Sequence, residues 1–432
     1  MRSAIDGKDT QAWAALRPQV VTLRRMDATP VRVELGLKGV PDSVRGLIET
    51  LEAAGHPSFV VGGSVRDLLL RRRPGDFDVA TAAPVETLLT LFPRAIPIGL
   101  QHGTVMVPTV DGPVDVTHFR GGTLLEDDLA RRDFTINAMA WHPIRGELFD
   151  PHDGRGDLTK ARLRAVGDAD ARFAEDPLRT LRGVRLAAEI ELEVSEALLA
   201  AMRRATPALA GIARERIRYE LKNLLLSTHV ARGLRLLRAA GLEAWLAPGV
   251  RNDAADVVAA LPAELELRLA GWLRGTRSAA ILRDLRFSRR TNQAVEQLLR
   301  WHPIDAGVDP SRDPNVRRRL KRVGPDRVAA LVALRQAELS HEAPEAAAGL
   351  AALVAGIARV ETVGRIALQR QDLAIDGWQV MEAMGNGPGP HVGRALEWLT
   401  DRVLEDPSRN TPDALRRLLA SFVAEAKQEE SP

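Results

Sequence analysis

The first part of the chain alternates between helical and strand-like spacing of hydrophobic residues. Residues 42–54 carry apolar side chains at three- and four-residue spacing, and Gly55 marks the end of the predicted helix. Its apolar stripe consists of Val44, Leu47, Ile48 and Leu51. Residues 84–91 predict a second helix. Strand composition characterises residues 59–61, 76–79, 95–98, 104–110 and 114–119. The dipeptide Asp111-Gly112 predicts a hairpin turn between the last two strands, so this region reads as α+β.

The remainder of the chain has a different pattern. From about residue 165 onward, leucine, alanine and arginine recur at helical spacing between clusters of glycine and proline, without a repeat of fixed length. Residues 1–40 show no firm periodicity and are treated as an extension. The pattern therefore predicts a small α+β region followed by a long all-α portion. The predicted segments are 1–40, 41–165, 166–230 and 231–432.

A glycine pair stands where the first strand should meet a helix. The apolar run 59–61 ends at Gly62 and Gly63, and Ser64 is a favourable N-cap for the helix that follows. The apolar positions of that helix are Val65, Leu68 and Leu69. A strand leading through a glycine turn into a helix N-terminus exposes backbone N–H groups and positive potential. This arrangement is a ready anion site, although an isolated glycine pair is usually only a turn.

Two aspartates alternate with apolar residues in the next predicted strand. Asp76 and Asp78 would share one face of the strand, while Phe77 and Val79 would occupy the other. Neighbouring carboxylates repel unless a cation lies between them, and an oxygen-only donor set suits Mg²⁺. Asp115, in the last predicted strand, is a candidate third ligand. An exposed polar residue on an edge strand is the alternative interpretation of Asp115, and both stay open at this point.

Two charged segments follow the predicted strands. Residues 126–133 predict a helix that begins with acidic residues, which suits the helix dipole, and that runs into residues 134–140. Taken alone, Arg131, Arg132 and Asp133 would form a surface charge cluster. Residues 151–158 are rich in turn formers and predict a loop.

Composition narrows the class of protein. There is no cysteine, so disulfides and thiolate metal sites are excluded. The start of the chain lacks a signal-peptide pattern, and the longest apolar run, residues 346–358, is shorter than the roughly 20 residues that span a membrane. We therefore expect a cytoplasmic protein without a membrane partner. The net charge is only +3, but basic residues cluster over 203–238. With a single tyrosine, the chain offers little surface for stacking unpaired bases, which favours structured RNA read through its backbone.

Several ordered blocks together resemble the class II tRNA nucleotidyltransferases of the DNA polymerase β superfamily, namely the CCA-adding enzymes and bacterial poly(A) polymerases. The blocks are GGSVRDLLL at 62–70 with DFD at 76–78, RRDFTINAMA at 131–140, DPHDGRGDL at 150–158, FAEDPLRTLRGVR at 173–185, and more weakly Glu215-Arg216 with Glu220. The resemblance implies a polymerase β-like head with a mixed sheet, here residues 41–165. It also implies an all-α neck that selects the base (166–230) and a body and tail that bind tRNA (231–432).

The resemblance assigns roles to particular residues. Asp76, Asp78 and Asp115 would be catalytic and bind two Mg²⁺ ions, which activate the RNA 3′-hydroxyl and neutralise pyrophosphate. The residues expected to bind the nucleotide are Gly62, Gly63, Arg66, Arg132, Asp133, Asn137, Asp176, Arg179, Arg182 and Arg185. Asp176 and Arg179 are three apart, so they would be neighbours on one helix face. Such a pair matches the amino group and ring nitrogen that cytosine and adenine both present, and could select C and A without a template.

The chain departs from the family pattern at one place. Members that add the terminal A carry a long flexible loop before the RRD block, whereas here only Gly121–Leu125 separate Arg120 from Glu126. The resemblance implies that members without the loop add only CC. We therefore predict addition of C residues from CTP to the tRNA 3′ acceptor end. The alternatives are complete CCA addition with CTP and ATP, poly(A) tailing, which residues 98–104 disfavour because they resemble the CCA branch, and a non-catalytic RNA-binding protein.

Overall fold

The computed structural model describes residues 31–32, 39–99, 103–340, 347–362, 369–385 and 387–429. Most of the predicted 1–40 extension, and the middle of segment 98–104, therefore lie outside the described residues. The chain forms two compact units. The first runs to Glu220 and includes Leu236–Trp245, and the second comprises Leu221–Arg235 and the chain from Leu246 onward. The predicted boundaries at 165 and 230 stay a prediction.

The first unit contains a mixed sheet of 8 strands in the order β1-β8-β7-β2-β3-β6-β5-β4. The strands are β1 (Val31–Arg32), β2 (Ser58–Val61), β3 (Phe77–Thr81), β4 (Ile96–Gly99), β5 (Thr104–Thr109), β6 (Gly112–His118), β7 (Ala140–His142) and β8 (Glu147–Phe149). Only the central β3–β6 pair is parallel; the other neighbours are antiparallel. Thr109 pairs with Gly112, so the hairpin turn is Val110-Asp111, one residue earlier than predicted.

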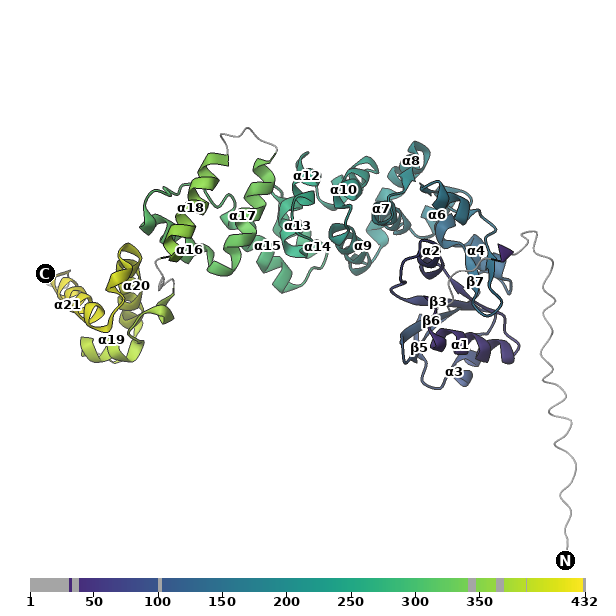
Figure 1. The fold of residues 1–432 in the computed structure, drawn as a ribbon, viewed down its shortest axis with the longest axis horizontal. Helices are drawn as coiled ribbons and strands as arrows, with labels where there is room; N and C mark the ends of the chain where they lie inside the picture. The colour runs from purple at the N-terminus through teal and green to yellow at the C-terminus, as the bar shows by residue number, and fades with distance from the viewer. Residues whose placement is uncertain are drawn as a thin grey trace, which may run out of the picture. The chain divides into compact units, whose positions relative to one another are not determined.

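Helices cover both faces of this sheet (Figure 1). On one face lie α1 (Asp42–Ala53) and α3 (Val85–Leu91), and the predicted stripe of α1 is buried in the core. This confirms the helical interpretation of the 42–54 pattern. On the other face, Leu125 and Leu129 of α4 (Leu125–Ala130) pack with Phe59 and Phe119.

Two segments of this unit differ from their predicted secondary structure. The helix expected over 126–133 ends at Ala130, and Arg131, Arg132 and Asp133 lie in the turn that follows. Segment 151–158, expected as a loop, contains α5 (Gly154–Thr159). This helix forms because the Asp150 carboxylate accepts the first N–H groups, from Gly154 at 2.7 Å and Arg155 at 2.9 Å.

A series of helices follows the sheet in the first unit. They are α6 (Ala169–Glu175), α7 (Arg179–Glu189) and α8 (Glu196–Ala205). The next three, α9 (Arg214–Leu226), α10 (Val230–Ala239) and α11 (Leu242–Leu246), have residues in both units. Two short strands, β9 (Arg162–Leu163) and β10 (Glu193–Val194), pair in parallel. The predicted order of an α+β head and an all-α remainder is confirmed.

The second unit is helical throughout its described part. Its helices are α12 (Ala254–Ala259), α13 (Leu265–Leu273), α14 (Ser278–Asp284), α15 (Arg289–Trp301), α16 (Asp313–Val323), α17 (Pro325–Leu339), α18 (Ala348–Thr362), α19 (Gly377–Met384), α20 (Pro390–Glu405) and α21 (Pro412–Glu429). Buried Arg268 of α13 links this helix to the end of α9 by donating to the carbonyls of Leu225 at 2.6 Å and Ser227 at 2.9 Å. Of the helices described, none combines the length and apolar character needed to span a bilayer.

Candidate active site

The glycine turn between β2 and α2 (Gly63–Leu69) has the geometry of an anion site. Gly62 is the N-cap, with φ 76° and ψ −137°, a backbone conformation that strongly favours glycine. No side-chain hydrogen bond caps this N-terminus, so its first N–H groups are left for an external acceptor. The prediction of Ser64 as N-cap is wrong, because the helix begins at Gly63. The Ser64 hydroxyl instead donates to the carbonyl of Val61 at 2.9 Å.

The sheet register gathers the predicted carboxylates beside this turn. In β3, Asp78 lies between Val61 of β2 and Asp115 of β6. Asp76 directly precedes β3 and is exposed. As the alternation predicted, Phe77 and Val79 pack into the core beneath α1, on the opposite face. Because β5 lies beyond β6, Asp115 is not on an edge strand, and the ladder places it next to Asp78.

The three carboxylates are electrostatically coupled. Burial raises the pKa of Asp78 to about 6, and the charges of Asp76 and Asp115 add to this rise, while Arg132 and Arg120 oppose it. Burial and the charge of Asp76 also raise the pKa of Asp115. Neighbouring carboxylates with raised pKa values are the donor chemistry that a divalent cation stabilises, so the residues fit such an ion. Among the described residues, no group of three His, Asp or Glu side chains is already closed into a metal cage.

Arg132 lies against both the glycine turn and the carboxylates. A Cβ atom at Gly62 would be 2.9 Å from Arg132 Nη1 and 3.5 Å from Asp78 Oδ2. The arginine is held by Asp128, which is fully buried and accepts from Nε at 3.0 Å and Nη2 at 2.8 Å. Asp128 also accepts from the Arg120 backbone N–H at 3.3 Å. The missing side chain of Gly62 therefore makes room for a guanidinium beside Asp78.

Sequence reasoning did not identify Asp128 and Arg120 as part of this site. A usable signal for Asp128 existed, because it precedes Arg132 by four residues, the spacing of a helical ion pair. Arg120 showed no local signal. Only the fold brings it near enough to Asp78 for its charge to lower the pKa of that carboxyl.

A continuous series of polar contacts links the glycine turn to the helices after the sheet. We call it the charge chain; its members are Arg66, Asn137, Asp133, Arg182, Glu220 and Arg185. Arg66 donates to Asn137 at 2.7 Å, and Asn137 donates to Asp133 at 3.1 Å. Arg182 donates to Asp133 at 3.0 Å and to Glu220 at 3.3 Å. Arg185 donates to Glu220 at 2.6 Å and also to Glu189 at 2.8 Å.

The charge chain gives several of the predicted nucleotide-binding residues a structural role. Asp133 is buried rather than part of a surface cluster. Burial alone would raise the pKa of Asp133, but Arg182 and Asn137 outweigh that effect and hold the pKa below its usual value. Arg182 and Arg185 direct their guanidinium groups at Glu220, a buried carboxylate. These residues therefore fasten the helices to the sheet, whether or not a nucleotide also reaches them.

The expected base-reading pair is arranged differently from the prediction. Asp176 lies between α6 and α7 rather than on α7, so it does not share a helix face with Arg179. Its carboxylate accepts from the Leu178 N–H at 3.1 Å and pairs with Arg216 at 2.8 Å. Arg179 instead donates to Glu175 at 2.9 Å and to the backbone carbonyls of Arg172 and Arg131 at 3.1 and 2.9 Å. The proline at position 177 explains the shift, because the residue before a proline avoids helical backbone.

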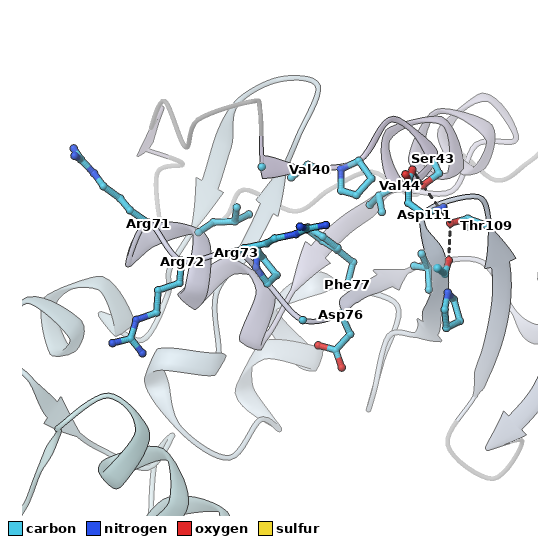
Figure 2. A pocket seen from close by; sticks show the side chains of 18 residues that line it. Val40, Ser43, Val44, Arg71, Arg72, Arg73, Asp76, Phe77, Thr109 and Asp111 are labelled. Carbon is cyan, nitrogen blue, oxygen red and sulfur yellow. Dashed lines mark hydrogen bonds between the residues drawn. The ribbon is translucent and has the colours of Figure 1, made fainter. Parts of the chain in front are cut away.

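Two hollows adjoin these residues in the first unit. The larger, about 1280 Å³, is lined by segments 39–44, 71–77 and 109–114, on the α1 side of the sheet. Figure 2 shows Asp76 on the loop that borders it, with Arg71 and Arg72 directed outward. The smaller, about 300 Å³, lies between α7 and α9. It is lined by Leu178, Arg182, Glu215, Arg216, Tyr219 and Glu220.

Comparison with known proteins identifies the family. Residues 58–164 match the family described as the Poly A polymerase head domain, and residues 191–253 match a probable RNA and SrmB-binding site of polymerase A. The CCA-adding enzyme of Latilactobacillus sakei is 34% identical over 397 residues, which cover 85% of this chain and 95% of that protein. The Geobacillus stearothermophilus CCA-adding enzyme is 37% identical over 244 residues, covering 53% and 57% of the two chains.

Solved structures agree with the sequence comparison. The Bacillus stearothermophilus CCA-adding enzyme in complex with CTP superposes with a TM-score of 0.72 at 29% identity, over 90% of this chain and 98% of that one. The Thermotoga maritima CCA-adding enzyme complexed with tRNA shares the fold, with a TM-score of 0.69 at 20% identity over 92% and 100%. The chain has the glycine turn and the cluster of three carboxylates, and it matches a CCA-adding enzyme over nearly the whole length of that relative. The chain therefore belongs to the CCA-adding enzyme family of tRNA nucleotidyltransferases.

Proposed function

We propose that this protein transfers cytidylate residues from CTP to the 3′ end of tRNA, releases pyrophosphate, and stops before the terminal adenosine. The observation that carries the proposal is the short connection between Arg120 and α4. In the family, addition of the terminal A goes with a long flexible loop at this place. Here α4 begins at Leu125, whose side chain is buried.

The connection is also tightly packed. A side chain at Gly121 would collide with Arg131, and one at Gly122 would collide with Asp127. Gly121 has φ 82°, which again favours glycine. The connection therefore lies against the residues of α4 and the turn after it, and leaves little free backbone for a lever that could reshape a base pocket.

The proposed chemistry follows from the carboxylates and the glycine turn. Asp76, Asp78 and Asp115 would hold Mg²⁺, which when bound supplies activation of the RNA 3′-hydroxyl and neutralisation of pyrophosphate. The N–H groups of Gly63 and its neighbours in the first turn of α2 would bind phosphate oxygens. Arg132, held in place by Asp128, would add a bidentate charged contact.

For base selection we propose Asp176 and Arg179. The Asp176 carboxylate would accept the cytosine amino group, and the Arg179 guanidinium would donate to the ring nitrogen. Each now pairs with a residue of the protein, Arg216 or Glu175, whose side chains are 49% and 43% exposed. Asp176 and Arg179 are themselves only 22% and 13% exposed, so a nucleotide that replaces these ion pairs must match the hydrogen bonds that they give up.

The deciding experiment supplies purified protein with tRNA lacking CCA, ending in C, or ending in CC, together with labelled CTP or ATP. We expect C on the first two ends and no A on the third. Incorporation of A onto the CC end would overturn the CC-only proposal in favour of complete CCA addition, the activity in the names of its relatives. Long A tails on any RNA would favour the poly(A) polymerase alternative.

A second experiment tests the carboxylate assignment. Asp78→Ala should abolish incorporation of labelled CTP, whereas Asp111→Ala, which removes an exposed carboxylate from the β5–β6 turn, should not. Survival of incorporation in Asp78→Ala would show that the metal assignment is wrong. Titration of wild type with Mg²⁺ after chelation should restore incorporation.

A further inference from the structure

Tyr219 is the one tyrosine in the chain, and it is exposed. Tyr219 lies on α9 and is 62% accessible to solvent. An exposed aromatic residue needs no special explanation by itself. Tyr219, however, borders the 300 Å³ hollow between α7 and α9, in the first unit.

The lining of this hollow suits a flat, polar ring. Leu178, which is 2% exposed, is an apolar lining residue of the hollow, and Arg182 and Arg216 line it as well. Phenol rings and guanidinium planes are the surfaces on which nucleobases stack in proteins that bind unpaired RNA. Glu215 also lines the hollow.

Two lining residues connect the hollow to the site already described. Arg216 pairs with Asp176 at 2.8 Å, the carboxylate proposed to read the base. Arg182 pairs with Asp133 at 3.0 Å and so belongs to the charge chain that leads to the glycine turn. An occupant of the hollow would thus lie beside the residues that bind the nucleotide.

We propose that Tyr219 stacks on a nucleobase held in this hollow. The inference rests on the proposed function, because the base belongs either to the incoming CTP or to the 3′-terminal nucleotide of the tRNA. Stacking tolerates different bases, since every base has a flat π face. Tyr219 would therefore strengthen binding without deciding between C and A, and it supplies a stacking surface that the low aromatic content made unexpected.

The test compares four substitutions, Tyr219→Phe, Tyr219→Trp, Tyr219→Leu and Tyr219→Ala. One arm measures the Kd of labelled CTP in the absence of tRNA. The other measures KM for tRNA lacking CCA at saturating CTP. We expect Phe and Trp to retain binding, and Leu and Ala to weaken it by roughly 5- to 150-fold, the range seen when one stacking aromatic is removed. Weakening confined to CTP assigns the incoming base, and weakening confined to tRNA assigns the 3′-terminal base.

Ile144→Ala is the matched control, because Ile144 is another exposed apolar side chain of the first unit, 46% accessible and outside the hollow. Thermal unfolding should be unchanged in all variants, since Tyr219 is exposed. Wild-type values for Tyr219→Leu and Tyr219→Ala in both arms would overturn the stacking proposal. If wild type binds CTP but never incorporates it, the proposed function fails, while the Kd arm still decides the role of Tyr219.

Discussion

A methyl group at position 62 would perturb the glycine turn at its tightest point. Gly62 has φ 76° and ψ −137°, a conformation that costs other residues about 1–3 kcal/mol. The new Cβ would lie 2.9 Å from Arg132 Nη1, so the guanidinium must move. That movement weakens its two hydrogen bonds to buried Asp128, and bonds to charged groups are worth about 1.5–3 kcal/mol. Because the arginine is flexible at its end, we expect a combined local loss of about 2–4 kcal/mol.

Hydrogen exchange and nucleotide incorporation measure the two consequences of Gly62→Ala separately. The amides of Val60 and Val61 in β2 should exchange faster, by the factor that corresponds to the lost free energy of local opening. In the activity assay, kcat/KM for CTP should fall by roughly 10- to 150-fold, because a displaced Arg132 no longer meets the phosphates in its proper place.

Gly63→Ala is the natural control for this experiment. Gly63 opens α2 with ordinary helical backbone, and its Cβ would come no closer than 3.4 Å, to Arg66 Nη2. Gly63→Ala therefore adds the same methyl group at the adjacent position without backbone strain, and the backbone N–H group of residue 63 is kept. If Gly62→Ala matched Gly63→Ala in both exchange and incorporation, the argument from backbone conformation and from Arg132 would be refuted.

Three further predictions concern buried carboxylates. Asp157→Ala should destabilise the first unit by roughly 2–4 kcal/mol, because buried Asp157 accepts from Thr135 and two arginines. Burial alone would raise its pKa, but these hydrogen bonds hold the pKa below its usual value. The stabilisation from the charged carboxylate should thus be complete above the ordinary Asp pKa near 4 and be lost as the pH falls below it. In a hydrogen-exchange measurement, the protection of wild type should then fall to that of Asp157→Asn. Glu220→Gln should cost about 2–4 kcal/mol by leaving Arg182 underpaired, whereas Glu196→Gln, at an exposed ion pair, should change hydrogen-exchange protection by less than about 0.5 kcal/mol; equal effects would contradict the argument. Asp128→Asn should lower kcat/KM for CTP about 10- to 100-fold with little change in the KM for tRNA, and a uniform loss in both would point to unfolding instead.

The elements that sequence predicts well here are those with local periodicity. The stripe of α1 repeats over a dozen residues, and the alternation from Asp76 to Val79 places polar and apolar side chains on opposite faces. The short strands β1, β7 and β8, of two or three residues each, are too brief to show a period. They form because neighbouring strands supply hydrogen-bond partners: β8 pairs with β7 on one side and with β1 on the other.

The residues of the site also divide into those that a local pattern predicts and those that only the fold brings into place. Gly62, Asp78 and Arg132 could be predicted from motifs and are brought together by the sheet. Asp128 was missed despite its four-residue spacing to Arg132, because three acidic residues at a helix start look like favourable charges in solvent, and only packing of α4 against the sheet buries one of them. Asp176 was predicted on the wrong element, since spacing alone cannot show that a helix breaks between two residues.

The charge chain also limits how the sequence of this protein can drift. Glu220 is shared by Arg182 and Arg185, and Arg182 is shared by Glu220 and Asp133. Reversal of either shared charge leaves two partners facing like charges in a partly buried setting, so a lone substitution there is costly and its cost depends on its neighbours. Among homologues, these positions should therefore change as a block, in coordinated pairs or triplets. The exposed pair of Arg204 with Asp170, bonded to each other at the surface, should vary one residue at a time.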